Sequence, residues 1–252
     1  MKIISTFNDK LYEFSGKEMI RSARAKIPDA EIIIYQELNQ NTLDLETVDV
    51  DNLPEVKKVL EENADIISTP FGGLADKDKM TMWNARWFGW FKKIAMGYHA
   101  TCVKQHKGYL LFVDSDIRFL SHFDERFIDR ATLGKSISYF RGNRSVAETG
   151  FIIVKADDLI VQDFYKYYIE LFLSKKFRDF PRWDDSYAFE NSMHNFDQKH
   201  FCDLAAGHLS NKHTNSNGHT TNAQIIAFTE WGEYVEHDKG IHWRNNLVPQ
   251  PE

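Results

Sequence analysis

The two residues with the clearest chemical potential are Asp114 and Asp116, which follow an apolar segment and are separated by one serine. In an extended chain, side chains two positions apart lie on the same side, so the carboxylates repel each other unless a cation lies between them. Mg²⁺ or Mn²⁺ meets that need, because such an ion binds one or two carboxylates and completes its coordination with water or phosphate oxygens. The alternative is a solvated turn capped by aspartate. A buried strand in front of the pair favours the metal site.

The segment before Asp114, residues 108–113 (GYLLFV), is almost entirely apolar, which predicts a central strand covered on both faces. Near the N-terminus, Lys2–Phe7 and Glu31–Tyr35 are strand-like segments on either side of a helical stretch over residues 14–26. Strand, helix and strand predict the βαβ unit of a parallel sheet, whose ligands bind at the carboxyl ends of the strands. Residues at those ends are therefore expected to border one crevice: Thr6, Phe7, Asn8, Tyr35 and Glu37.

Residues 81–98 form an aromatic segment in which Trp83, Trp87, Trp90 and Ile94 recur at helical spacing. Further apolar residues widen this stripe, so we expect a helix that is buried on nearly all sides. Three basic residues are unusual on such a helix: Arg86, Lys92 and Lys93. Extension of each basic side chain to the surface is the simpler interpretation of each residue taken singly.

The remaining elements indicate one α/β domain with a mostly parallel, Rossmann-like central sheet flanked by helices. A polar connection over residues 39–80 contains a short helix at 54–63. Strands over 136–140 and 150–155 precede a long amphipathic helix over about 157–176. The C-terminal third is less regular.

Composition excludes several classes of protein. The 252 residues include 31 Lys and Arg against 37 Asp and Glu, a net charge of −6, which opposes a nucleic-acid-binding role because phosphate binding needs a positive footprint. Two cysteines, Cys102 and Cys202, stand in no metal or redox spacing, so a disulfide scaffold is excluded. No apolar run approaches the length of a transmembrane segment and the first residues lack a signal-peptide pattern, so we expect a cytoplasmic protein.

The order of these features resembles the nucleotide-sugar-dependent glycosyltransferases of the GT-A fold: a βαβ start, an aromatic and basic helix, and an apolar strand that ends in Asp-x-Asp. The resemblance covers about residues 1–160 and is thinner in the C-terminal part. It implies one GT-A domain over residues 1–252, with a nucleotide-sugar-binding half over about 1–120 and an acceptor-binding half and closing tail over about 121–252.

The resemblance implies roles for residues on the donor side. Asp114 would contact the ribose or the metal, Asp116 would coordinate the metal, and Ser115 would lie against the ribose. A basic residue of the aromatic helix, Arg86 or Lys93, would reach the donor, together with the strand-end residues named above.

Two downstream segments also resemble the family. Glu148-Thr149-Gly150-Phe151 is similar to the segment beside the donor sugar, and its glycine permits close approach of the backbone. Trp183-Asp184-Asp185 is similar to the acidic element that faces the acceptor and supplies the general base in inverting members. We expect Asp185, before Asp184, to have that catalytic role. The alternative is that one of them caps the following helix, and capping does not exclude catalysis.

The segment His237-Asp238-Lys239-Gly240 resembles a His-x-x-Gly element that completes the metal site in many GT-A enzymes. It implies that His237 is a third metal ligand and that Gly240 lies near the diphosphate. Members with the full form continue with Lys-Pro-Trp, whereas Ile241-His242-Trp243-Arg244 follows here, so the cation for the diphosphate is Lys239 or Arg244.

The function implied is transfer of a sugar from a nucleoside diphosphate donor, a UDP-sugar before a GDP-sugar, to a hydroxyl of an unidentified glycan, lipid or protein, with Mn²⁺ or Mg²⁺ as cofactor. One alternative is a sugar nucleotidyltransferase, but Thr6-Phe7-Asn8-Asp9 is not the Gly-rich basic loop expected after its first strand. Another is an inert carbohydrate-binding protein that retains the fold. Such a protein would have no need of the two aspartates and His237 together.

Overall fold

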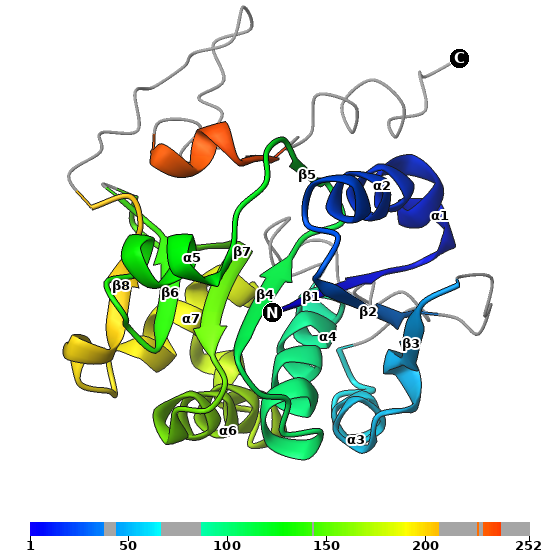
Figure 1. Ribbon diagram of the computed structural model, residues 1–252. Helices are drawn as coiled ribbons and strands as arrows, with labels where there is room; N and C mark the ends of the chain where they lie inside the picture. The colour runs from blue at the N-terminus through cyan, green and yellow to red at the C-terminus, as the bar shows by residue number, and fades with distance from the viewer. Residues whose placement is uncertain (38–43, 67–86, 143, 207–225, 227–228, 238–252) are drawn as a thin grey trace, which may run out of the picture.

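The computed structural model describes residues 1–37, 44–66, 87–142, 144–206, 226 and 229–237. Its centre is a seven-stranded sheet in the order β3-β2-β1-β4-β7-β6-β8 (Figure 1). The strands of this sheet are β1 (Lys2–Phe7), β2 (Glu31–Gln36), β3 (Glu46–Asp49), β4 (Tyr109–Val113), β6 (Ile137–Phe140), β7 (Glu148–Lys155) and β8 (Phe201–Asp203). Among them only β7 runs antiparallel to its neighbours, β4 and β6, so the expected mostly parallel α/β sheet is confirmed.

Helices cover both faces of the sheet. The α-helices in the described residues are α1 (Asp9–Leu11), α2 (Lys17–Lys26), α3 (Pro54–Glu62), α4 (Trp87–Tyr98), α5 (Glu125–Ala131), α6 (Leu159–Leu173) and α7 (Asp185–Met193). Two π-helical segments, η1 (Tyr12–Gly16) and η4 (His99–Val103), join or extend them. The short 3₁₀ segments are η2 (Val50–Asn52), η5 (Lys176–Asp179), η6 (Gln198–His200) and η9 (Glu230–Glu233).

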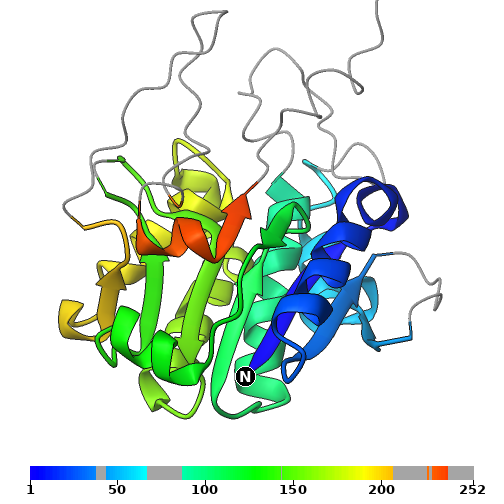
Figure 2. The ribbon, with the colours of Figure 1, turned by 45° about the horizontal axis from the view of Figure 1, so that its top comes forward.

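Two hydrophobic clusters lie on opposite faces of the sheet because alternate strand residues point to opposite sides. In β4, Leu110 and Phe112 pack with α3, α4, α6 and α7, whereas Leu111 and Val113 pack with α2 and α5. Figure 2 shows α2 in front of the sheet and α4 behind it. All five residues of β4 are buried, as its apolar sequence predicts.

The helices and strands differ from the sequence-based prediction at several places, three of which have a clear local reason. The first helical region begins at Asp9 rather than at residue 14, because Asn8 caps α1 and η1 continues into α2. Strand β3 was missed, since its polar sequence ETVD lies at the sheet edge. The long helix is shorter than predicted and is confined to α6.

A second sheet has two strands, β5 (Ile117–Phe119) and β9 (Val235–His237), which pair antiparallel. β5 starts directly after Asp116, so this pairing returns the C-terminal part of the chain to the carboxyl end of β4. In the part of the chain that the structure describes, no helix has the length and apolar character needed to span a bilayer.

Candidate functional site

The two aspartates of the Asp-x-Asp motif lie in the turn after β4, and β9 brings His237 beside them. In the β5–β9 pairing, Ile117 stands opposite His237. The Nε2 atom of His237 is 3.1 Å from Asp116 Oδ1 and 3.7 Å from Asp114 Oδ2. One ligand atom from each of these three residues lies within 4.8 Å of the other two. The three residues predicted as metal ligands therefore converge on one site. We call Asp114, Asp116 and His237 the metal cluster.

This cluster fits a divalent cation. His237 is 8% exposed, and within the described residues its Nε2 makes no hydrogen bond. A buried nitrogen without a hydrogen bond is energetically unfavourable, and so are two neighbouring carboxylates without a cation. Carboxylate oxygens suit Mg²⁺ and Mn²⁺, and an imidazole ligand favours Mn²⁺ over Mg²⁺. Partial burial raises the pKa of the Asp114 carboxyl, while the ammonium group of Lys93 acts in the opposite direction.

Gly150, near the start of β7, passes so close to the cluster that a larger residue would displace one of its side chains. A Cβ atom there would lie 2.4 Å from Cε1 of His237 and 2.8 Å from Oδ2 of Asp114. The Gly150 carbonyl also accepts a hydrogen bond from the Asp114 N–H at 2.8 Å. Glycine therefore lets the β7 backbone lie against these two side chains without displacing them.

Lys93 connects the metal cluster to Asp185. Its Nζ lies 2.7 Å from Asp114 Oδ1 and 2.7 Å from Asp185 Oδ2, so Asp114 presents one carboxylate oxygen to Lys93 and the other to His237. Burial lowers the pKa of Lys93, but the two carboxylates outweigh burial and the net pKa is raised. The interpretation that this lysine extends to the surface is wrong.

Lys92 is also buried rather than extended to the surface. Its Nζ lies 2.9 Å from Glu37 Oε2 and 2.7 Å from Asp51 Oδ1. This ion pair fixes the carboxyl end of β2 to α4 and η2. It therefore assigns Glu37, one of the expected crevice residues, to a structural contact.

Asp184 and Asp185 have different surroundings at the start of α7. Asp184 is 2% exposed and is the N-cap, accepting a hydrogen bond from the Tyr187 N–H at 3.0 Å. Asp185 accepts a hydrogen bond from Thr149 Oγ1 at 2.7 Å, at the same oxygen that contacts Lys93. Capping therefore belongs to Asp184, and Asp185 is the residue joined to the metal cluster.

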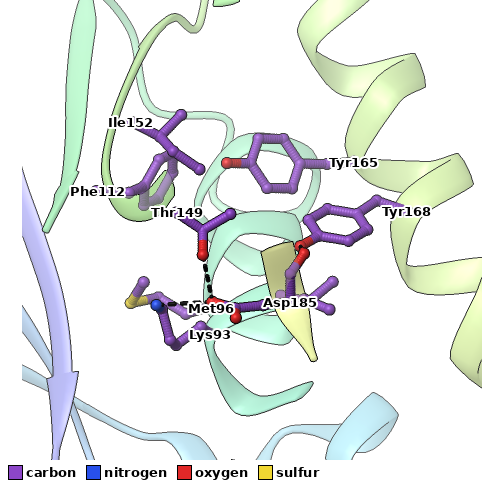
Figure 3. Close-up of a pocket in the computed structure, with 9 residues that line it drawn as sticks. Lys93, Met96, Phe112, Thr149, Ile152, Tyr165, Tyr168 and Asp185 are labelled. Carbon is purple, nitrogen blue, oxygen red and sulfur yellow. Dashed lines mark hydrogen bonds and ion pairs between the residues drawn. The ribbon is translucent and has the colours of Figure 1, made fainter. Parts of the chain in front are cut away.

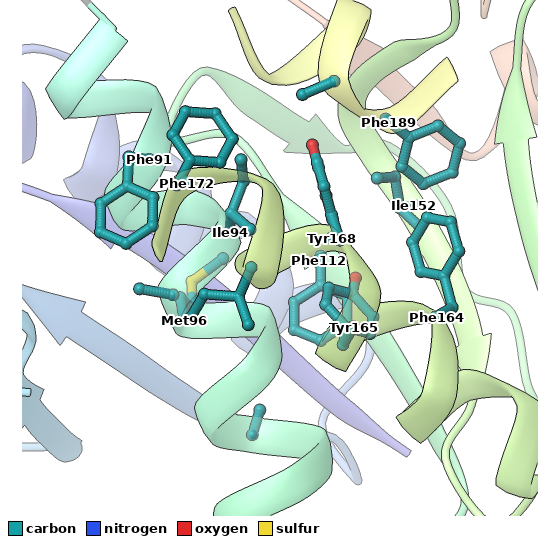
Figure 4. Packing of buried hydrophobic residues seen from close by; sticks show 14 of the residues in the cluster. Phe91, Ile94, Met96, Phe112, Ile152, Phe164, Tyr165, Tyr168, Phe172 and Phe189 are labelled. Carbon is teal, nitrogen blue, oxygen red and sulfur yellow. The ribbon is translucent and has the colours of Figure 1, made fainter. Parts of the chain in front are cut away.

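A small cavity lies beside Lys93, Thr149 and Asp185, whose contacts are drawn in Figure 3. Its volume of about 20 Å³ is enough for one water molecule and too small for a sugar. The hydroxyl of Tyr168 donates a hydrogen bond to the Asp185 carbonyl at 2.6 Å. Aromatic side chains from α4, α6 and α7 pack around this region (Figure 4) and hold the polar groups in place.

Three of the predicted donor-binding residues, besides the metal cluster, have polar side chains at the carboxyl edge of the sheet. Ser115 is 8% exposed and accepts a hydrogen bond from Ser15 Oγ in η1 at 3.1 Å. At the end of β1, Thr6 Oγ1 donates to the Tyr35 carbonyl at 2.7 Å, and Asn8 caps α1. These residues lie at the carboxyl edge of the sheet, as expected.

Phe7 and Tyr35 lie at the same edge, but their side chains point into the core. They are 1% and 0% exposed, and the Tyr35 hydroxyl bonds to His99 Nδ1 at 2.8 Å. Strand alternation directs these two side chains onto opposite helix-covered faces of the sheet, where each packs in a hydrophobic cluster. Four further predicted residues lie outside the described residues: Arg86, Lys239, Gly240 and Arg244.

Sequence reasoning missed several contacts that shape the site. The hydrogen bond from Thr149 to Asp185 joins β7 to α7, and Ser15 reaches Ser115 from η1. Arg144 pairs with Glu148 at 2.7 Å next to Gly150. One partner or both in two of these contacts carried a signal in the sequence, namely Ser115, Thr149 and Asp185, and so did Glu148, whereas Ser15 and Arg144 carried none.

Comparison with known proteins gives a consistent result for the fold. No protein-family model matches the sequence, and no curated protein sequence matches it. Apo mouse xyloside xylosyltransferase 1 aligns over 100% of both chains, with a TM-score of 0.52 and 11% sequence identity.

Two other solved structures are similar to the same extent. An active-site mutant of LgtC aligns with a TM-score of 0.51 and 11% identity over 95% of this chain and 88% of LgtC. The bifunctional glycosyltransferase WbbM aligns with a TM-score of 0.53 and 10% identity over 95% of this chain and 46% of WbbM, so this chain spans about half of that protein. At these identities the similarity is one of backbone arrangement, and the chain has the GT-A fold of these glycosyltransferases.

Proposed function

We propose that this chain is a metal-dependent glycosyltransferase that moves a sugar from a nucleoside diphosphate sugar to a hydroxyl acceptor. The observation that carries the proposal is the convergence of Asp114, Asp116 and His237 at the carboxyl end of β4, within the GT-A fold. Ligands of open α/β sheets bind at this edge. Three oxygen and nitrogen donors around one point give a nucleotide diphosphate a place to bind through a shared ion.

Asp114, Asp116 and His237 would hold Mn²⁺ or Mg²⁺, with Mn²⁺ favoured by the imidazole. When bound, the ion neutralises charge that develops on the leaving diphosphate. One carboxylate oxygen of Asp114 faces this site and the other contacts Lys93, so the lysine fixes the orientation of the Asp114 side chain. The predicted contact of Arg86 with the donor remains part of the proposal, as do those of Gly240 and of either Lys239 or Arg244 with the diphosphate.

The donor nucleoside would lie beside Ser115 and the end of β1, near Thr6 and Asn8. We propose UDP rather than GDP as the nucleotide. Because the side chains of Phe7 and Tyr35 are buried, these two residues would contact the donor only through their backbone atoms. In the proposed division of the chain, residues up to about 120 bind the donor and later residues bind the acceptor.

Asp185 would act at the reacting end of the donor. Its Oδ2 is held by Lys93 and Thr149, whereas among the described residues Oδ1 accepts one hydrogen bond, from the N–H of Ser186. A lone pair of Oδ1 therefore remains to accept a hydroxyl proton as the bond to phosphate breaks. The fixed position of Asp185 reduces the entropy lost in reaching a reactive geometry.

Two other functions use related features. A sugar nucleotidyltransferase would release pyrophosphate from a nucleoside triphosphate and a sugar phosphate. An inert carbohydrate-binding protein would bind glycans without a metal. Neither accounts as directly for the joint placement of the three ligands and Lys93.

The test is a panel of UDP- and GDP-sugars incubated with purified protein, with Mn²⁺ or with a chelator, while free nucleotide and sugar are measured. We expect the protein to hydrolyse one of the sugar nucleotides slowly. This hydrolysis should need Mn²⁺ and should be absent in Asp116→Ala. Pyrophosphate release from UTP and a sugar 1-phosphate would instead favour the nucleotidyltransferase. Glycan binding without any sugar-nucleotide turnover would favour the inert protein.

A further inference from the structure

Glu148 and Arg144 form a buried ion pair behind the metal cluster that the proposed reaction does not use directly. Their side chains are 4% and 13% exposed, and Arg144 Nη1 lies 2.7 Å from Glu148 Oε2. Burying a charged pair is costly unless further hydrogen bonds compensate for desolvation, so its presence needs a reason. That reason lies two residues further along β7.

The backbone N–H of Gly150 depends on Glu148 for its hydrogen bond. The ladder between β4 and β7 ends where Asp114 donates to the Gly150 carbonyl, and the Asp114 carbonyl instead accepts from the Ile117 N–H at 3.1 Å. The Gly150 N–H therefore needs another acceptor. Oε1 of Glu148 supplies it at 3.0 Å.

This hydrogen bond fixes the backbone at the most crowded point of the site. A Cβ at residue 150 would lie 2.4 Å from Cε1 of His237, 2.8 Å from Oδ2 of Asp114 and 3.0 Å from Oε1 of Glu148, so all three groups surround the Gly150 Cα. A small shift of this backbone would push His237 or Asp114 out of position. The second carboxylate oxygen of Glu148 is held by Arg144, which fixes the rotamer of Glu148.

We infer that the Arg144–Glu148 pair is a positioning device for the metal site, acting through the Gly150 backbone on His237 and Asp114. The inference rests on the proposed function, because it assigns the pair to the metal that the reaction would use. Glu148 is not one of the residues whose ligand atoms converge on the described metal cluster. It acts through a hydrogen bond, and its negative charge is neutralised by Arg144.

The experiment measures binding of Mn²⁺ alone by titration, with free Mn²⁺ followed by electron paramagnetic resonance, and records the melting temperature of each variant. Loss of residues behind metal ligands weakens affinity by about 10- to 100-fold, so Glu148→Ala is expected to weaken Mn²⁺ binding at least tenfold. The double variant Arg144→Gln/Glu148→Gln keeps an acceptor for Gly150 within an uncharged amide pair. The Mn²⁺ affinity of this double variant is expected to stay within about threefold of that of the original protein, a much smaller change than the loss expected in Glu148→Ala.

Glu190→Ala is the matched control, because Arg141 and Glu190 form an equally short ion pair at 2.7 Å with a largely buried glutamate. It is expected to lower the melting temperature without weakening Mn²⁺ binding. If Glu148→Ala does not fold, Glu148→Asp takes its place, since aspartate keeps the charge but is one methylene too short to contact Arg144 and the Gly150 N–H in the geometry that glutamate adopts. Weak binding by Glu148→Asp beside near-normal binding by the double variant would support the inference.

Two results would overturn the inference. One is unchanged Mn²⁺ affinity in Glu148→Ala, or in Glu148→Asp where that variant replaces it. The other is a double variant that binds as weakly as the alanine variant, because charge rather than position would then be responsible. If the original protein binds no Mn²⁺, the proposed metal site itself fails, which is a separate outcome.

Discussion

The metal cluster and the neighbouring Lys93–Asp185 contact are built from similar residues but differ in how their polar atoms are paired. Around Lys93, two carboxylates and the hydroxyl of Thr149 meet at distances of 2.7 Å. At the metal cluster, His237 Nε2 lies among carboxylates and, within the described part of the chain, makes no hydrogen bond.

This difference in hydrogen bonding suggests different roles: the Lys93–Asp185 contact supports the site, and the metal cluster is the candidate binding site. A buried polar group whose hydrogen bonds are all made rigidifies its surroundings. A buried polar group without a hydrogen bond is destabilising and indicates a place for a ligand. Asp114 belongs to both regions, through one carboxylate oxygen each. Under the proposed function, the Lys93–Asp185 contact would keep Asp114 oriented toward the metal.

The largest expected effect comes from removing a ligand of the cluster. Asp116→Ala should reduce Mn²⁺-dependent hydrolysis of the donor by about 10³-fold or more and weaken UDP binding with it, because the diphosphate is held mainly through the ion. Donor hydrolysis and UDP titration with and without Mn²⁺ provide the measurement. Full metal-dependent turnover in this variant would remove the basis of the proposed function.

The second prediction concerns the supporting region. Asp185→Asn should lower the transfer rate by about 10²-fold while UDP affinity stays near normal, because a carboxylate that accepts a proton acts on the reaction rather than on donor binding. Rate and affinity are measured separately, by single-turnover transfer and by titration. A variant that lost UDP affinity as strongly as rate would place Asp185 in the binding site.

The third prediction tests the crowding around the metal cluster. Gly150→Ala places a methyl group 2.4 Å from His237 Cε1, and relief of such overpacking costs about 1–3 kcal/mol. Mn²⁺ affinity should fall about tenfold. Gly89→Ala is the matched control, since nothing lies within 4 Å of its Cβ position and alanine stabilises a helix. Equal Mn²⁺ affinity in the two variants would contradict the close approach.

Local sequence patterns predicted the elements whose burial follows from their own residues. The apolar residues of β4 and those that repeat at helical spacing in α4 are largely buried in the core. The edge strand β3 was missed because a strand that borders solvent on one side needs little apolar character. Its place in the sheet depends on pairing with β2.

The candidate site was predictable only in part, because it depends on partners far apart in the sequence. The Asp-x-Asp spacing indicated a metal, and the resemblance added His237. Helical periodicity predicted the buried aromatic face of α4 but not the contacts of Lys93, because its carboxylate partners come from the end of β4 and the start of α7 and left no local pattern. The choice between Asp184 and Asp185 likewise required the geometry of the helix start.

The smallest expected effect concerns Asp184, which is the N-cap of α7 and adjoins Asp185 in the sequence. It accepts hydrogen bonds from the Tyr187 N–H at 3.0 Å and from Arg182 Nε at 2.8 Å. Asparagine caps helices about as well as aspartate, whereas alanine costs about 1–2 kcal/mol.

For a chain of this size that loss corresponds to a fall in melting temperature of roughly 2–8 °C in Asp184→Ala. Asp184→Asn should melt closer to the original protein, and both variants should keep UDP affinity and transfer rate, because Asp184 faces the helix backbone rather than Lys93. Thermal unfolding and single-turnover transfer measured on the same samples check this. An inactive Asp184→Asn beside a near-normal Asp185→Asn would exchange the roles of the two aspartates, and the reacting group would then lie at the helix cap.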